Sequence, residues 1–209
     1  MTRPLIRIVD DDPALGESFA MLLETMGWDV VRYTEGRDFL EHDALEGPGC
    51  IVLDVRMPGL TGLDVQEELV RRGSKLPILF LSAHGTIATA VHALHRGAVD
   101  FLEKPVDPMV FVQKVSRAVA ASVDEHVRER EESERRNRFE TLTPREKDVV
   151  HAVLEGKANK VIARDLGLEV STIKMHRANA FAKLGVHSPA ELTRLAFESG
   201  YADAKTTLP

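Results

Sequence analysis

The most informative stretch of the sequence is the apolar run Cys50-Ile51-Val52-Leu53, followed directly by Asp54-Val55-Arg56-Met57-Pro58-Gly59. Four more short apolar runs lie within residues 1–121. They are largely β-branched or aliphatic and mostly do not alternate with polar residues, which is typical of strands buried in a parallel sheet. The five predicted strands are Leu5–Val9, Trp28–Tyr33, Cys50–Leu53, Ile78–Leu81 and Val99–Leu102.

Stretches with helical spacing separate these strands. One carries an apolar stripe and is followed by Gly27, and another ends at Gly73. Five strands alternating with five helices predict a doubly wound α/β domain over residues 1–121. The two stripes consist of Leu15, Phe19, Leu22, Leu23 and Met26 in the first case, and of Leu63, Val65, Leu69 and Val70 in the second.

The linker predicted over residues 122–139 is highly charged. Its central part holds one valine and otherwise polar or charged residues, without proline or glycine. Opposite charges recur four residues apart, as in Glu131 with Arg135 and Glu132 with Arg136, and this spacing stabilises solvated helices. The pattern favours a helical linker; the alternative is a disordered charged tether.

Residues 140–209 show no strand pattern and predict a small all-α domain. Its first helix starts at Thr143-Pro144, with Glu146 placed to complete a capping box. Glycines follow the first two helices. The four helices are expected at residues 143–155, 158–166, 170–183 and 188–199, which is the rhythm of a helix–turn–helix domain.

The net charge of −6 is unevenly spread along the chain. Residues 1–121 hold 12 basic and 18 acidic side chains, whereas residues 140–209 hold 10 basic and 9 acidic ones. The total argues weakly against nucleic-acid binding, but the acidic excess lies outside the C-terminal domain. A pair of such near-neutral domains would make twice as many phosphate contacts as one.

Cysteine usage and hydropathy indicate a cytoplasmic protein. The single cysteine, Cys50, excludes a disulfide within the chain and a cysteine-rich zinc site. No apolar run approaches the roughly 18 residues that a membrane span needs. The first residues lead directly into a strand-like segment rather than a signal peptide. We therefore expect no membrane partner.

Chemically reactive side chains stand where the predicted strands end. Asp10 and Asp11 follow the first strand, Asp54 the third, Ser82 the fourth and Lys104 the fifth. Open parallel sheets bind ligands at this edge, so the groups are expected to converge. Converging carboxylates repel one another unless a hard cation such as Mg²⁺ lies between them. The set predicts a phosphoryl-transfer site with Asp54 as nucleophile.

Two other interpretations of the acidic residues are open. Asp12-Pro13 has the form of a helix N-cap, so the acidic triplet by itself would mark only a helix start. A phosphatase of the haloacid-dehalogenase type also forms an aspartyl phosphate with Mg²⁺, but it needs Asp-x-Asp with a second acid. Asp54-Val55-Arg56 lacks that acid, and the residues after the acidic triplet do not continue the motif.

Residues 1–121 resemble the receiver domain of two-component response regulators. The matching motifs are Asp10-Asp11, the Asp54 segment up to Gly59, Ser82-Ala83 and Lys104-Pro105. The resemblance implies a flavodoxin-like sheet with strand order 2-1-3-4-5. It also implies that a sensor histidine kinase phosphorylates Asp54, and that the bond before Pro105 is cis.

The same resemblance assigns roles to individual residues. Mg²⁺ would be bound by Asp11, Asp54 and the backbone carbonyl of Arg56, with Asp10 assisting through water. The phosphoryl oxygens would be bound by Ser82 and Lys104, and Phe101 would be the aromatic residue that moves with Ser82. Arg56 and His84 occupy positions that tune the lifetime of the phosphate, although His84 by itself is equally well a surface histidine.

The third helix of the C-terminal domain has the pattern of a DNA-recognition helix. Ile173, Phe181 and Leu184 would anchor it to the core, and Ile162, Ala163 and Leu166 would form the inner face of the helix before it. Recognition helices place their N-terminal residues against base edges and basic residues near phosphates. The residues expected to face DNA are Lys160, Ser171, Thr172, Lys174, Met175, Arg177 and Ala178. The alternative is a helix bundle that binds only protein.

Residues 140–203 resemble the LuxR-type helix–turn–helix of the FixJ branch of the NarL/FixJ response regulators. The resemblance rests on the Leu-Thr-Pro-Arg-Glu opening at 142–146 and the Lys-x-His-Arg-x-Asn run at 174–179. It implies that Lys174, Met175 and Ala178 face bases, and that Lys160 and Arg177 face phosphates or base edges. It also implies a dimer contact on the last helix, around Ala190, Leu192, Leu195 and Ala196.

Together these observations predict a phosphorylation-controlled switch that binds DNA and regulates transcription, as an activator. The implied partners are a sensor histidine kinase, double-stranded promoter DNA, a second copy of the chain on phosphorylation, and RNA polymerase. Beyond promoting its own phosphoryl transfer and dephosphorylation, the protein is not expected to be an enzyme.

Overall fold

The computed structural model describes residues 3–83 and 85–201 of the chain. The chain divides into two compact units, Met1–Val127 and Arg128–Pro209, each of which is described by itself. Among the described residues, no helix combines the length and the apolar character needed to cross a membrane.

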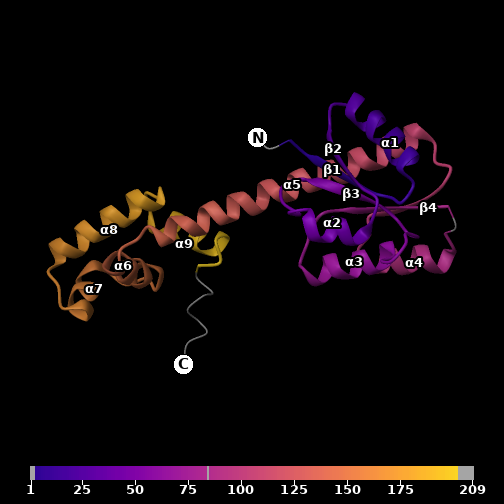
Figure 1. Cartoon of the computed structure of the whole chain (residues 1–209). Coiled ribbons are helices and arrows are strands. Elements are labelled where there is room, and N and C mark those ends of the chain that lie inside the picture. The colour runs from indigo at the N-terminus through magenta and orange to yellow at the C-terminus, as the bar shows by residue number, and fades with distance from the viewer. Residues whose placement is uncertain (1–2, 84, 202–209) are drawn as a thin grey trace. The chain divides into compact units, whose positions relative to one another are not determined.

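The N-terminal unit is built on a five-stranded parallel sheet with strand order β2-β1-β3-β4-β5 (Figure 1). Order and direction are those predicted, and the predicted strand ends differ from the observed ones by one residue at most. The strands are β1 (Leu5–Val9), β2 (Asp29–Tyr33), β3 (Gly49–Asp54), β4 (Ile78–Ser82) and β5 (Asp100–Glu103).

Helices cover both faces of this sheet (Figure 1), which confirms the doubly wound architecture. On one face, Phe19 of α1 and Phe111 of α5 pack over Ile8, with ring centroids 4.3 Å apart. On the other face, Phe39 of α2 and Val65 of α3 belong to a second core. The helices are α1 (Pro13–Thr25), α2 (Gly36–His42), α3 (Gly62–Arg71), α4 (Ile87–His95) and α5 (Pro108–Glu140).

Two residues of the predicted apolar stripes lie in solvent instead. Met26 is 56% exposed because α1 ends at Thr25, so Met26 is already the C-cap residue. Val70 is 58% exposed because it is one residue, about 100° of helix, beyond the buried Leu69. Gln66, which the predicted apolar stripe did not include, is buried and faces the core from α3.

A buried ion pair joins β1 to the residue that follows α2. Arg7 is 1% exposed, and its Nε donates to Oδ1 of Asp43 at 2.8 Å. Asp43 also accepts hydrogen bonds from the Tyr33 hydroxyl at 3.0 Å and from the Leu45 N–H at 2.7 Å. Burial, with the hydrogen bond to Asp43, raises the pKa of Tyr33 to about 12. The apolar pattern of Leu5–Val9 gave no sign of this network.

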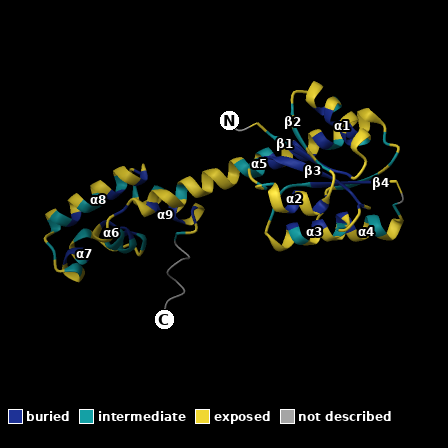
Figure 2. Cartoon of the chain, viewed as in Figure 1, coloured by how far each residue is buried: buried dark blue, intermediate teal, exposed yellow. Residues whose placement is uncertain are grey.

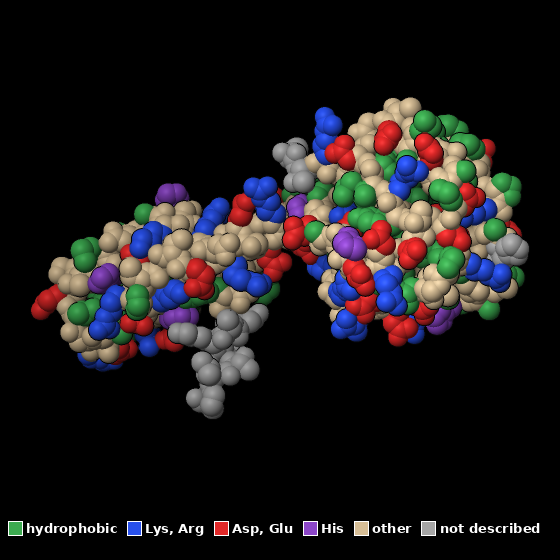
Figure 3. All heavy atoms as spheres, in the orientation of Figure 1, with side chains coloured by type: hydrophobic (Ala, Val, Ile, Leu, Met, Phe, Trp, Pro, Cys, Tyr) green, Lys and Arg blue, Asp and Glu red, His purple; other side chains and the backbone are tan. Residues whose placement is uncertain are grey.

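The predicted linker is helical and forms part of one long helix, α5. The two predicted pairs are present: Glu131 with Arg135 at 4.0 Å, and Glu132 with Arg136 at 3.1 Å. The middle of α5 is exposed (Figure 2), and basic and acidic side chains interleave along it (Figure 3). The division into 1–121, 122–139 and 140–209 stays a prediction.

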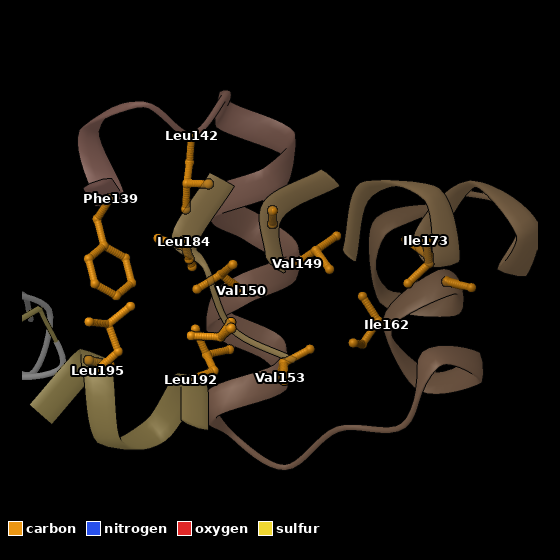
Figure 4. Packing of buried hydrophobic residues seen from close by; sticks show 14 residues of the cluster. Phe139, Leu142, Val149, Val150, Val153, Ile162, Ile173, Leu184, Leu192 and Leu195 are labelled. Carbon is orange, nitrogen blue, oxygen red and sulfur yellow. The ribbon is translucent and has the colours of Figure 1, made fainter. Parts of the chain in front are cut away.

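The C-terminal unit is all-α, as predicted, with a core of its own (Figure 4). Phe139, at the end of α5, is fully buried in this core beside Leu195. Thr143 and Glu146 form the predicted capping box, and Gly167 ends the second helix in the left-handed conformation. The four helices are α6 (Pro144–Leu154), α7 (Asn159–Leu166), α8 (Val170–Leu184) and α9 (Pro189–Glu198).

The structure places most of the residues named for a dimer contact on α9 in the core, so a contact through their side chains is wrong, while dimerisation itself stays a prediction. Leu192, Leu195 and Ala196 point into the core of their own unit and are at most 8% exposed. Of the four residues named for that contact, only Ala190 is exposed. An amphipathic stripe shows that a helix has an apolar partner, but not whether that partner lies in the same domain.

Candidate functional site

Three carboxylates converge at the carboxyl edge of the sheet. β1 and β3 are neighbours, with Val9 opposite Leu53, so Asp10 and Asp54 lie side by side at the strand ends. Asp10, Asp11 and Asp54 each offer an oxygen within 4.8 Å of the others. Asp10 and Asp54 are buried, while Asp11 is exposed, so the cluster opens to solvent on one side.

The ammonium group of Lys104 bridges the two buried carboxylates. Its Nζ lies 2.7 Å from Oδ2 of Asp10 and 3.0 Å from Oδ1 of Asp54. Burial alone would lower the pKa of Lys104, but the hydrogen bonds to both carboxylates outweigh it and raise this pKa. The peptide bond from Lys104 to Pro105 is cis, as the resemblance implied.

Asp54 is the carboxylate on which the site is centred. Burial raises its pKa above the ordinary value, against the opposing effect of the hydrogen bond from Lys104. The Arg56 N–H donates to Oδ2 of Asp54 at 3.1 Å, so the backbone two residues further on lies against this carboxylate. A buried carboxylate held by one cation and one N–H has its oxygens fixed in place, which is the arrangement that a carboxylate nucleophile would need.

The predicted switch residues lie on the two strands beyond Asp54. Ser82 is buried at the end of β4, opposite Glu103 of β5. Phe101 of β5 is half-buried, and its ring stacks on that of Phe80 with centroids 6.1 Å apart. His84, expected to tune phosphate lifetime, lies outside the described residues.

Two glycines shape this site and were missed by sequence reasoning. A Cβ on Gly62 would lie 2.1 Å from the backbone oxygen of Asp54, and a Cβ on Gly85 would lie 2.5 Å from Cε1 of Phe101. Neither position has room for a side chain. The sequence did hold a signal for Gly62: it is a glycine eight residues after the predicted nucleophile and directly before an apolar stripe.

In the C-terminal unit, α7 and α8 form a helix–turn–helix. Ile162 of α7 and Ile173 of α8 face each other in the core (Figure 4), and residues 167–169 connect the two helices. Most of the residues expected at DNA are exposed: Lys160, Ser171, Lys174, Met175 and Ala178. Thr172 and Arg177 are half-buried, and Phe181 is only partly buried at the edge of the core.

Comparison with known proteins agrees with these two units. Residues 6–116 match the family described as response regulator receiver domain, and residues 140–196 match the luxR family of bacterial regulatory proteins. The chain belongs to the NarL/FixJ-type response regulators. The first match contains the acidic cluster and Lys104, and the second contains the helix–turn–helix.

Relatives match along nearly the whole chain. This response regulator is 38% identical to the transcriptional regulatory protein FixJ of Azorhizobium caulinodans, over 98% of the chain and 97% of that protein. It is 38% identical to nodulation protein W of Bradyrhizobium diazoefficiens, over 93% of the chain and 86% of that protein. The protein is therefore a two-component response regulator that acts as a transcription regulator.

Solved structures support the fold along nearly the whole chain. The response regulator StyR matches with a TM-score of 0.87 and 34% identity, over 94% of this chain and 100% of that one. Full-length FixJ from B. japonicum matches with a TM-score of 0.57 and 34% identity, over 96% of this chain and 99% of that one.

Proposed function

We propose that Asp54 accepts a phosphoryl group from a sensor histidine kinase, and that this modification controls DNA binding by the C-terminal unit. The carrying observation is that Asp54 is buried beside Asp10 and Asp11 with Lys104 at 3.0 Å. One oxygen of Asp54 attacks the phosphorus of the kinase phosphohistidine. The P–N bond breaks, and the imidazole nitrogen leaves with the bonding electron pair and takes up a proton.

The acidic cluster fits a divalent cation. Asp10, Asp11 and Asp54 offer three oxygens close together, and the exposed side at Asp11 leaves room for water, as Mg²⁺ requires. We propose that these residues and the carbonyl of Arg56 hold Mg²⁺. A bound Mg²⁺ supplies neutralisation of the phosphoryl charge. In the protein itself, Lys104 already offsets part of the negative charge of Asp10 and Asp54.

We propose that phosphorylation is read out by Ser82 and Phe101. The Ser82 hydroxyl and the Lys104 ammonium bind the new oxygens, and Phe101 follows Ser82. Two contacts of Phe101 support this: its ring stacks on that of Phe80, and its ring edge lies close against Gly85, where only a glycine fits. Arg56 and His84 set how fast water removes the phosphoryl group, a step that the protein promotes on itself.

On the output side, we propose that residues 1–121 act on residues 140–209 through the helical linker. Phosphorylated chains pair, so that two helix–turn–helix units reach adjacent half-sites of promoter DNA in the cytoplasm and contact RNA polymerase to activate transcription. Lys174, Met175 and Ala178 face bases. Lys160, Ser171, Thr172 and Arg177 complete the surface, with phosphates as the targets of the basic residues.

The first experiment locates the phosphoryl group. The protein is incubated with acetyl phosphate and Mg²⁺ and analysed by intact mass. We expect one added phosphoryl group in the wild type and none in Asp54→Asn. Asp64→Asn, at an exposed helix-cap aspartate outside the cluster, is the matched control and should be labelled like the wild type. Labelling of Asp54→Asn would show that the acceptor lies elsewhere.

The second experiment separates DNA binding from the alternative in which the helical unit binds only protein. A mobility-shift assay with total genomic fragments is run with and without acetyl phosphate. We expect a subset of fragments to shift more strongly after phosphorylation. Lys174→Ala should weaken binding to such a fragment by about 1–3 kcal/mol. If no fragment shifts in either state, the DNA-binding role is wrong.

A further inference from the structure

Arg177 is held on two sides within the helix–turn–helix. Its Nη1 donates to Oδ1 of Asn159 at 3.0 Å. Its guanidinium carbon lies 5.1 Å from the centroid of the Phe181 ring, one turn further along α8. All three side chains are half-buried. A hydrogen bond at one edge and an aromatic ring at one face together fix the plane of the guanidinium.

Asn159 is the first residue of α7, so its bond to Arg177 joins the supporting helix to the middle of the recognition helix. The other contacts that join α7 and α8 are apolar and involve Ile162, Ala163 and Ile173. Within the part of the chain that the structure describes, Asn159 has no other side-chain hydrogen bond. Holding Arg177 is therefore the one interaction that its amide oxygen makes there.

Most of the hydrogen-bonding capacity of Arg177 remains available. A guanidinium carries five N–H donors, and within residues 3–83 and 85–201 its only hydrogen-bond partner is Asn159. The guanidinium nitrogens that have no partner are not fully buried, so their N–H donors face solvent. The residue that follows each of the two partners in the sequence is exposed: Lys160 after Asn159, and Ala178 after Arg177.

We propose that Asn159 is a positioning residue for DNA binding. By holding Arg177 against Phe181, it presents the remaining N–H donors in one orientation to a single DNA phosphate next to Lys160. The inference rests on the DNA-binding role proposed for α8. Because phosphate contacts carry no sequence information, Asn159 and Arg177 set affinity for all sequences rather than the choice of bases. The fixed side chain loses less rotamer freedom on binding than a mobile one.

The test is a double-mutant cycle on the full-length, acetyl-phosphate-treated protein. The probe is a duplex enriched from a random-sequence pool on the wild type, with bulk genomic DNA as the non-specific competitor. We expect Arg177→Ala to weaken binding about tenfold. It should also reduce the slope of the logarithm of the association constant against the logarithm of the salt concentration by about one per bound protomer. Asn159→Ala should weaken binding about threefold and leave the salt slope unchanged, because the charge of Arg177 remains.

The double variant should bind no more weakly than Arg177→Ala alone, because Asn159 acts only through Arg177. The ratio of specific to non-specific binding should be unchanged in both single variants. Asn137→Ala, at an exposed asparagine of α5, is the matched control and should behave as the wild type. Thermal unfolding of each variant shows whether the unit is intact. If Asn159→Ala does not fold, Arg177→Lys, which keeps the charge without the planar fork, should keep the salt slope but bind more weakly.

Three results would overturn the inference. The losses of binding free energy in the two single variants could add fully in the double variant, Asn159→Ala could bind DNA as tightly as the wild type, or the salt slope of Arg177→Ala could equal that of the wild type. Failure of the underlying function looks different. In that case no duplex is enriched on the wild type, and Lys174→Ala has no effect on any DNA.

Discussion

Replacing Asp43 by alanine should destabilise the N-terminal unit strongly. The change leaves the buried guanidinium of Arg7 without its counter-charge, and it removes the acceptor for the Tyr33 hydroxyl and the Leu45 N–H. The side chains of Arg7 and Asp43 are only 2% and 4% exposed, so water does not replace the lost partner. Breaking a buried ion pair by removing one partner costs about 3–5 kcal/mol.

The loss can be measured through the only tryptophan of the chain, Trp28, which directly precedes β2 in the same unit. Urea denaturation followed by its fluorescence reports the free energy of unfolding of the N-terminal unit. A loss of this size should also lower the melting temperature by about 10–20 °C.

Two comparisons separate the buried pair from ion pairing in general. Arg3→Ala breaks an exposed pair with Asp29, at 3.9 Å and with both side chains more than half exposed, and should cost less than about 1 kcal/mol. The double variant Arg7→Met with Asp43→Leu should regain most of the stability lost in Asp43→Ala, because it leaves no unpaired charge. The reasoning is refuted if Asp43→Ala is no less stable than Arg3→Ala.

Three further predictions concern other parts of the structure. The hydrogen bond from Lys183 lowers the pKa of Glu146, so Glu146→Gln should be less stable than the wild type at neutral pH in far-UV circular-dichroism melts. That difference should disappear as the pH falls below the ordinary value of 4.5 and through the lowered pKa of the folded state; a constant difference would contradict it. Gly62→Ala should lower the free energy of unfolding by more than about 2 kcal/mol and slow labelling by acetyl phosphate, because its Cβ would meet the Asp54 carbonyl. The Cβ of Gly59→Ala meets no atom, so that variant should lose only about 1 kcal/mol, from its positive φ. Equal losses of the two variants in urea denaturation would contradict the crowding at Gly62. Leu192→Ala should lower the stability of the C-terminal unit by about 2–5 kcal/mol at every protein concentration, since Leu192 is a core residue. A loss of stability seen only at protein concentrations where the chain is dimeric would instead place Leu192 in a dimer contact.

The sheet and its acidic edge were predictable because local patterns settle them. Short apolar runs alternating with helical stretches are compatible with few arrangements, and parallel strands bring the residues after Val9 and Leu53 together whatever the details of packing. The caps at Asp12 and Thr143 were predictable for a similar reason, since a capping side chain bonds backbone groups two or three residues away.

Interactions between distant residues were not predictable from the same patterns. Arg7 interrupts an apolar strand, and its partner Asp43 lies 36 residues away in a segment without periodicity. Arg177 and Asn159 are 18 residues apart, and nothing in the basic pattern of α8 shows that one of its cations is bound by an amide. The apolar face of α9 was assigned to a partner because the sequence does not say how much core the other three helices need.

The central claim is that phosphorylation at Asp54 controls DNA binding, and one titration tests it most directly. The affinity for a duplex enriched on the wild-type protein is measured with and without acetyl phosphate and Mg²⁺, in the wild type and in Asp54→Asn. We predict tighter binding on treatment in the wild type, and a weak affinity in Asp54→Asn that treatment leaves unchanged. Equal tightening of both proteins, or no change in a wild type shown by mass to be phosphorylated, would contradict the claim.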